Sequence, residues 1–330
     1  MNRIERTLRF LQDQEIRETP FRISRPQKAP IAYNCVIVMV QQLIVNGIIA
    51  AGIYALVGVG FGLIYNTGRF FHFAHGAVYA WGAYLCYAGA ALWKWPMWLA
   101  VLFGVIGAAI LGTLMEVCVY RPLRKRKGTP LVLLLASLGL FVVFQNLISM
   151  IFGDDTKTLR TGDVVEGLPI FGARITPVQI AIIAVSAVLV LTTWIFLKRS
   201  RHGIAIRAVA NDPELALISG LDPDRYLLVV FFIGSALAGA GAILISFDTD
   251  MVPLMGFNAL LMAVVAVIVG GMGSVPGIAL GALLVGLAQN LGVWKLPTQW
   301  QDTIVFAILL VFLLFRPQGF LGRKVTKASV

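Results

Sequence analysis

The sequence predicts an all-α membrane protein, a polytopic bundle of about eight or nine transmembrane helices. Hydrophobic residues make up 58% of the chain and charged residues only 13%, against roughly 25% charged residues in a soluble domain. The mean hydropathy is +0.85. The apolar stretches reach the length of about 20 residues that crosses a bilayer, and they lack the alternating pattern of an outer-membrane barrel.

The apolar stretches divide the chain into three parts. We place a charged N-terminal tail at 1–35, where Ile4–Ile16 has the spacing of an amphipathic helix, a membrane domain at 36–320, and a C-terminal tail at 321–330. The predicted spans lie near 36–64, 74–93, 96–119, 130–152, 176–197, 226–247, 258–275, 277–293 and 301–316. Only Pro276 separates 258–275 from 277–293, so this pair is either two crossings or one broken, re-entrant segment.

The charges of the loops predict the orientation. The segments 121–127 and 198–225 and the C-terminal tail are basic, whereas 153–175 carries Asp154, Asp155, Asp163 and Glu166. Because basic loops stay on the cytoplasmic side, the first three are expected inside and 153–175 outside. Counting single spans back from 121–127 places the N-terminal tail outside, although the tail is rich in arginine. The side of the tail is therefore left open.

Several classes of function are excluded by what the chain carries. The net charge of +11 gathers at the ends of apolar spans, so we expect no nucleic-acid partner. The three cysteines, Cys35, Cys86 and Cys118, lack metal-ligand spacing, and we predict no metal site. The sequence contains no phosphate-binding loop and no paired intramembrane carboxylates, so we expect neither ATP hydrolysis, proton coupling nor another catalytic centre in this chain.

A polar segment interrupts the apolar pattern at 201–225, RHGIAIRAVANDPELALISGLDPDR. We predict one short helix within it, because Asp212 can accept a backbone N–H at its start and Pro213 suits the first helical position. Gly220 suits a left-handed stop, and Asp222-Pro223 repeats the start signal. Leu215 and Ile218 share one face. A capped connector that packs on its own protein is the plain alternative, but an ordered helix on the cytoplasmic side also suits a partner protein.

The chain resembles the LivH-type permeases of ABC importers for branched-chain amino acids. RHGIAIRAVANDPELALISGLDPDR is similar to their cytoplasmic coupling segment and FHFAHGAVYAWGAYL (71–85) to their NFAHG segment. VVAVIVGGMGSVPGIALGALLVG (264–286) and FRPQGFLGR (315–323) are similar to their late glycine-rich segment and C-terminal end. The resemblance runs from about Gln41 to Arg323 and leaves out the charged tail.

The resemblance implies a multi-pass permease in the bacterial inner membrane, with a cytoplasmic C-terminus, that carries branched-chain or other small amino acids. It also implies two cytoplasmic ATPases that bind the ATP, a second related permease and an external solute-binding protein. Under this reading the coupling segment is 199–225. Its contact residues are Arg207, Asp212, Pro213, Glu214, Leu215, Ile218 and Gly220. Urea or short amides as substrates, or a channel working alone, remain as alternatives, and a homodimer and a heterodimer of permeases stay open.

Candidate residues for the translocation path come from polar and glycine-rich positions inside the spans. They are Asn46, His72, His75, Gly270, Gly271 and Gly273. His72 stands where the resembled family has Asn, and we favour hydrogen bonding of both histidines to backbone freed at a broken helix over direct contact with substrate. GGMGSVPG predicts an interrupted helix facing a cavity. GRFFHFAHG and GGMGSVPG each precede a small-residue helix, which suggests two structural repeats.

Overall fold

A computed structural model describes the backbone of residues 28–160, 167–170 and 172–322, and the side chains of 36–160, 167–169 and 172–322. The predicted amphipathic helix at Ile4–Ile16 and nearly all of the C-terminal tail lie outside the described residues. Met1–Val38 forms a unit separate from Met39–Val330. All contacts reported below belong to Met39–Val330.

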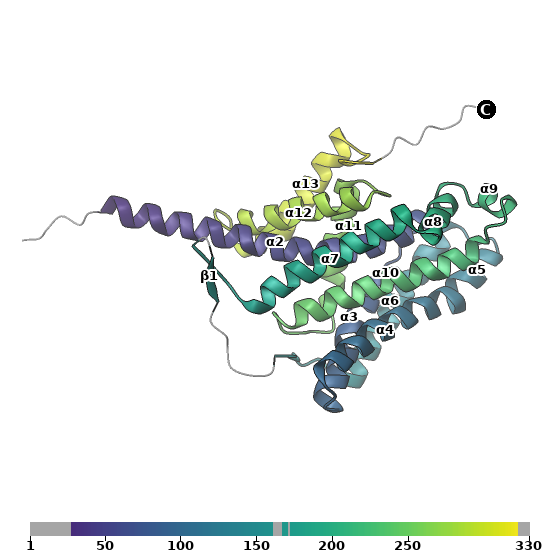
Figure 1. Cartoon of the computed structure of the whole chain (residues 1–330), viewed down its shortest axis with the longest axis horizontal. Coiled ribbons are helices and arrows are strands. Elements are labelled where there is room, and N and C mark those ends of the chain that lie inside the picture. The colour runs from purple at the N-terminus through teal and green to yellow at the C-terminus, as the bar shows by residue number, and fades with distance from the viewer. Residues whose placement is uncertain (1–27, 161–166, 171, 323–330) are drawn as a thin grey trace, which may run out of the picture. The chain divides into compact units, whose positions relative to one another are not determined.

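Helices form almost the whole of the described membrane domain (Figure 1). The long ones are α2 (Lys28–Gly68), α3 (Ala74–Tyr87), α4 (Met97–Met115), α6 (Pro130–Phe152), α7 (Pro177–Arg199), α10 (Pro223–Ser246), α11 (Met255–Gly270), α12 (Val275–Gly292) and α13 (Gln301–Phe315). Two π-helical turns, η1 (Ala88–Leu92) and η2 (Glu116–Tyr120), extend α3 and α4, and α5 (Arg121–Lys125) follows η2. A single 3-10 turn, η3 (Thr298–Trp300), precedes α13.

The predicted fold class is confirmed. Among the described residues, seven helical segments are long and apolar enough to cross a membrane, and α11 is a shorter apolar helix. The predicted spans 258–275 and 277–293 are the separate helices α11 and α12. Large apolar side chains such as Met150, Leu314 and Phe315 are 76%, 71% and 81% exposed. In a bilayer these side chains face lipid, so their exposure carries no cost.

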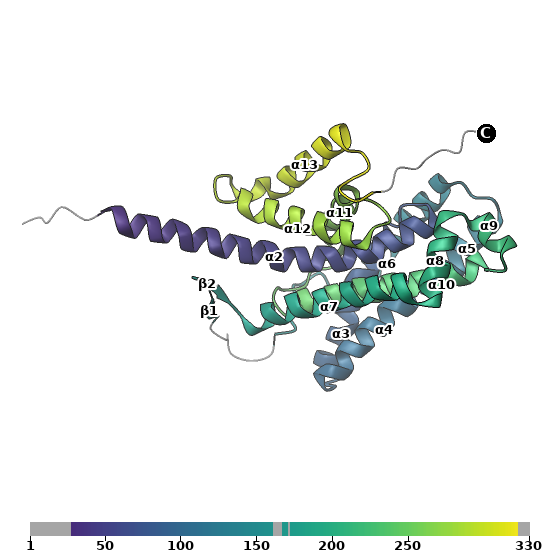
Figure 2. The same cartoon turned by 45° about the horizontal axis from the view of Figure 1, so that its top comes forward.

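The loop between α6 and α7 contains a small β-hairpin that the sequence analysis did not predict. Strands β1 (Leu168–Ile170) and β2 (Ala173–Ile175) pair antiparallel, with Leu168 opposite Ile175 and Ile170 opposite Ala173 (Figure 2). Gly172 provides the left-handed residue of the turn, at φ +83°.

The described membrane domain has two distinct ends. Helices α5, α8 (Arg201–Asn211) and α9 (Pro213–Ile218) gather at one, which we call the basic end, and the β-hairpin lies at the other, the hairpin end (Figure 1). In the first half of α2, the Gln42 side chain donates to the Arg174 carbonyl at 3.1 Å and accepts the Arg174 N–H at 2.8 Å. The chain thus enters the membrane domain at the hairpin end, on the side of loop 153–175.

Glycines let the central helices approach at backbone distance. A Cβ built on Gly82 of α3 would lie 2.5 Å from the Gly239 Cα of α10, and one on Gly60 of α2 would lie 2.5 Å from the Gly234 carbonyl oxygen. No side chain fits at these crossings. Helices α2 and α3 therefore pack directly on α10, as small-residue interfaces do in lipid.

Candidate functional site

The polar segment forms two helices where the sequence analysis predicted one. Helix α8 covers Arg201–Asn211 and α9 covers Pro213–Ile218, and Asp212 joins them. The Ser200 hydroxyl caps α8 by accepting the Gly203 N–H at 2.9 Å. The first helix was missed because its basic opening, RHGIAIR, lacks the acidic first turn that marks α9. Arg207 projects from α8 as an exposed side chain whose Nη2 donates to the Lys198 carbonyl at 3.4 Å.

The predicted ends of α9 are confirmed. The Asp212 carboxylate accepts the N–H groups of Glu214 and Leu215, both at 3.0 Å, and Pro213 occupies the first turn. Gly220 follows the helix at φ +81°, a left-handed conformation that costs glycine little. Asp222 in turn accepts the Asp224 N–H at 3.0 Å and starts α10. These caps hold a six-residue helix that could not persist alone in water.

Helix α9 exposes three apolar side chains. Leu215, Leu217 and Ile218 are 60%, 60% and 84% exposed, whereas Ala216 is buried. The apolar face formed by Leu215 and Ile218 is thus not covered by the described part of the chain. Glu214 lies beside it, also exposed. Among these α9 residues, only Ala216 packs on the rest of the chain, as the plain alternative of a connector packed on its own protein would require.

His72 and His75 meet in a fully buried polar centre near the basic end of the bundle. Both side chains are 0% exposed, and their ring centroids lie 5.7 Å apart. The Nδ1 atom of His72 lies 3.0 Å from the Tyr120 hydroxyl and 3.4 Å from the Ser137 hydroxyl. We call His72, His75, Tyr120 and Ser137 the histidine centre. It joins η2, α6 and the bend between α2 and α3.

The role expected for the histidines is wrong for His72. Its ring bonds to side-chain hydroxyls, and the backbone freed at the bend is satisfied instead by Ser137, which accepts the Ala74 N–H at 2.9 Å. The Nε2 atom of His72 is buried without a hydrogen-bond partner among the described residues. A Cβ on Gly60 would lie 3.2 Å from His75 Nε2, so His75 is pressed against α2. Both ring nitrogens of His75 are likewise buried without a hydrogen-bond partner among the described residues.

A cluster of four charged residues joins η2 and α5 to the start of α10 at the basic end. Arg124 binds the fully buried carboxylate of Glu116 through both terminal nitrogens, with Nη1 3.1 Å from Oε2. Arg121 Nε donates to Asp224 at 2.9 Å, and Arg124 lies 3.7 Å from the same carboxylate. Arg121 therefore pairs with Asp224, and Arg124 pairs with Glu116.

The glycine-rich segment breaks the helix as predicted. Helix α11 ends at Gly270. The next residues are left-handed, with φ +103° at Gly271 and +92° at Gly273. The Ser274 hydroxyl then caps α12 by accepting the Gly277 N–H at 3.2 Å. The break contacts the C-terminal segment, because Phe320 N–H donates to the Val269 carbonyl at 2.9 Å and Leu321 N–H to the Gly270 carbonyl at 3.1 Å. The predicted cavity face is wrong for Gly270 and Gly271, because Gly270 is buried against Gly277 of α12 and Gly271 against Gly322 of the C-terminal segment.

The candidate path residues do not form one cluster. Asn46 accepts a hydrogen bond from Gln42 at 3.1 Å near the hairpin end of α2. The rise of α2 separates Asn46 from the bend at His72 by roughly 30 Å. Gly273 lies next to Asn66, whose Oδ1 would be 3.4 Å from a Cβ built on that glycine. Asn66 and Gly273 are thus near the basic end, while Asn46 is far from both.

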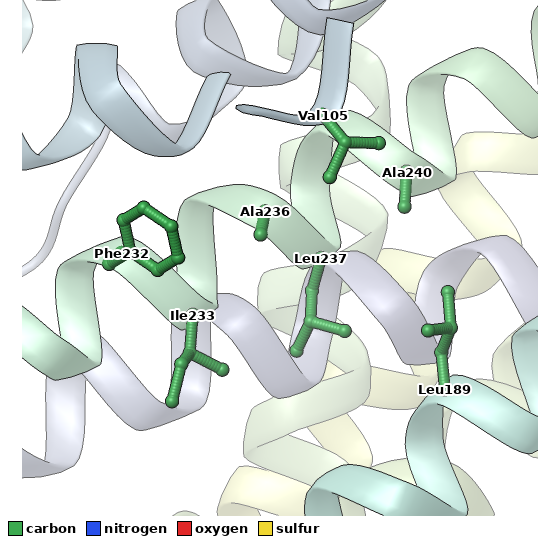
Figure 3. Close-up of a pocket in the computed structure, with 7 residues that line it drawn as sticks. All are labelled: Val105, Leu189, Phe232, Ile233, Ala236, Leu237 and Ala240. Carbon is green, nitrogen blue, oxygen red and sulfur yellow. The ribbon is translucent and has the colours of Figure 1, made fainter. Parts of the chain in front are cut away.

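An apolar groove opens between α4, α7 and α10 (Figure 3). Its lining consists only of Val105, Leu189, Phe232, Ile233, Ala236, Leu237 and Ala240. A zwitterionic solute would lose its hydrogen bonds to water there without replacement. The groove therefore suits a lipid chain better than a polar solute. Among the described residues, no group of three His, Cys, Asp or Glu side chains could hold a metal ion.

Three residues of the site escaped the sequence analysis as site residues. Tyr120 and Ser137 reach His72 from positions 48 and 65 residues away, so no local pattern reveals them. Arg69 donates through Nη2 to the carbonyls of Ala210 and Asn211, both at 2.9 Å. A lone arginine directly after a long apolar span was the one available signal for it.

The fold and the site define a multi-pass membrane permease with a capped helix pair at one end and a buried histidine centre. The chain belongs to the family described as branched-chain amino acid transport system / permease component, whose model matches residues 43–314. It is therefore a transport subunit and not an enzyme, as the sequence predicted. The resemblance on which that prediction rested is confirmed.

The match extends over nearly the whole length of individual relatives. The chain is 36% identical to the high-affinity branched-chain amino acid transport system permease protein LivH of Salmonella typhimurium, over 86% of this chain and 95% of the relative. It is 33% identical to BraD of Pseudomonas aeruginosa over the same shares. A solved structure, PsaBC from Streptococcus pneumoniae in complex with Fab, covers 87% of this chain and 97% of its own at 14% identity and a TM-score of 0.49.

Proposed function

We propose that this chain is a permease subunit of an ATP-driven importer that carries branched-chain amino acids across the inner membrane. The family and the names of its relatives, which are branched-chain amino acid permeases, support the substrate class. Two cytoplasmic ATPases bind the ATP, an external protein delivers the solute, and a second permease completes the channel. The basic end and the C-terminal tail face the cytoplasm, and the membrane domain is 36–320.

The exposed apolar side chains of α9 are the observation that carries the proposal. Leu215, Leu217 and Ile218 stand in water unless a partner covers them, and the caps at Asp212 and Gly220 fix their direction. An apolar surface beside Glu214 and the exposed Arg207 suits a protein groove that receives a helix. Closure of the ATPases would push α8 and α9, and the bundle would change between outward-open and inward-open states.

Copurification tests the partner contact. Ile218→Asp places a charge on the most exposed apolar position of α9, so the ATPases should no longer copurify with the permease and leucine uptake should fall about tenfold or more. Leu168→Asp, at the hairpin end and 52% exposed, is the matched control and should keep the ATPases. Retention of the ATPases by Ile218→Asp would contradict the contact.

Uptake measurements test the substrate class. Cells that lack their own branched-chain amino acid import and express this chain with its ATPases, second permease and binding protein should accumulate labelled leucine, isoleucine and valine. Labelled urea serves as the comparison. Accumulation of urea without the amino acids would overturn the proposed substrate class but would leave the proposal of an importer standing.

The path residues follow from the same proposal. The solute passes Asn46 at the hairpin end and the histidine centre near the basic end, while Gly273 and its neighbours Gly270 and Gly271 let α11 and α12 pack closely beside the path. The unpaired Nε2 of His72 offers a polar contact for the solute. Binding along such a path has to be weak, because tight binding would slow release.

A further inference from the structure

Arg69 connects the end of α2 to the end of α8. Its own N–H donates to the Tyr65 carbonyl at 2.9 Å and so remains part of the last turn of α2. Its guanidinium nitrogen Nη2 donates to both the Ala210 and the Asn211 carbonyls at 2.9 Å. The side chain therefore bridges a membrane helix and the first helix of the polar segment.

The chemistry of this contact is specific. The last carbonyls of α8 have no intrahelical partners and lie at the negative end of the helix dipole, which a guanidinium satisfies. Arg69 adopts φ +57°, a left-handed conformation that costs a residue with a Cβ about 1 kcal/mol or more. A glycine at this position would adopt the same backbone conformation at a lower cost in free energy. The contact with α8 gives a reason for that choice.

The bend after Arg69 leads directly to the histidine centre. Phe70, 2% exposed, packs on Tyr120 with ring centroids 4.8 Å apart, and His72 follows with its bond to the same tyrosine. Movement of Arg69 along the α2 axis would therefore displace His72. The connection is short, because the two residues are three positions apart.

A second connection reaches the same centre from the C-terminal end of the polar segment. Asp224, in the first turn of α10, binds Arg121 and lies near Arg124, and Arg124 holds Glu116 at the start of η2. Tyr120 is the last residue of that π-helical turn and bonds to His72. The end of α8 and the start of α10 thus both lead to one buried histidine.

We propose that Arg69 is the positioning residue that transmits a displacement of α8 and α9 to His72. The inference rests on the proposed function, in which the ATPases move these helices. Loss of the Arg69 bonds would leave the ATPases docked and active while the permease responds poorly. The expected defect is uncoupling, not loss of assembly.

Purified importer complexes in lipid vesicles provide the test. Arg69→Ala should retain ATPase copurification and ATP hydrolysis, while leucine uptake per ATP hydrolysed falls about tenfold. Arg69→Lys keeps one charged donor and should recover part of the ratio. Arg126→Ala is the matched control, an exposed arginine at the same end without a side-chain hydrogen bond among the described residues, and it should leave the ratio unchanged.

The outcomes separate the two proposals. If the wild-type complex contains no ATPase, the proposed function fails. If the wild-type complex transports leucine and Arg69→Ala keeps its transport ratio, the positioning role is overturned. Loss of ATPase binding in Arg69→Ala also overturns it, because Arg69 would then serve docking. Should Arg69→Ala fail to fold, Arg69→Met, which removes every donor and keeps most of the side-chain volume, decides the question by the same ratio, and an unchanged ratio in that variant overturns the role.

Discussion

At the scale of single residues, the Glu116–Arg124 pair has the largest expected effect on stability. The Glu116 side chain is 0% exposed and the Arg124 side chain 20%. Arg124→Ala would leave a buried carboxylate without its partner, so the free energy of unfolding should fall by about 3 kcal/mol. Thermal unfolding of the purified permease in detergent, followed by size-exclusion chromatography, measures the loss.

The double variant Glu116→Leu/Arg124→Met is the control for that prediction. It removes both charges at once and keeps the volume, so its unfolding free energy should stay within about 1 kcal/mol of wild type. A double variant as unstable as Arg124→Ala would show that the loss comes from packing and not from the unpaired charge.

Residue roles were predictable where they are local. The caps at Asp212 and Gly220 followed from a few adjacent letters, because capping chemistry is decided within one helical turn. The partners of His72 were not, since Ser137 comes from another helix and only packing brings it close. The hydrogen-bonding role of a buried histidine depends on such distant neighbours.

At the scale of elements, the C-terminal segment acts as a clasp on the α11–α12 break. Gly319 has φ +73°, and a Cβ there would lie 2.5 Å from the Gly271 backbone nitrogen. Gly319→Ala meets both a strained backbone and rigid main chain, so it should destabilise the permease by about 1–3 kcal/mol. The thermal unfolding midpoint should fall, and protease should cut the C-terminal segment faster.

Gly139 of α6 supplies the matched comparison. A Cβ built there meets nothing within 4 Å, and its φ is not positive, so Gly139→Ala should leave the unfolding midpoint unchanged or slightly higher. Equal losses of stability in the two variants would mean that the removal of a glycine, and not the loss of the clasp, causes the effect.

The break between α11 and α12 was predictable from GGMGSVPG. Its contact with FRPQGFLGR, some 45 residues later, was not, because long-range backbone pairing leaves no local pattern in a sequence.

At the scale of the whole molecule, the loop charges and the helix packing agree on two ends. The basic segments 121–127 and 198–225 meet through the Arg121–Asp224 pair, and Gly273 next to Asn66 places the C-terminal clasp at the same end. The arginine-rich N-terminal tail was the exception that the charge rule could not resolve. The Gln42–Arg174 hydrogen bonds place Gln42 of α2 beside the acidic loop.

Cysteine labelling in intact cells tests this orientation. In a background where Cys35, Cys86 and Cys118 are replaced, Asp155→Cys, at a side chain 93% exposed, should react with a membrane-impermeant maleimide added outside. Ser219→Cys, exposed after α9, should react only after the cells are opened. Positive charge holds loops inside chiefly when they are short and close to a span. Labelling of Ser219→Cys from outside would reverse the orientation and, with it, remove α9 from the reach of any cytoplasmic ATPase.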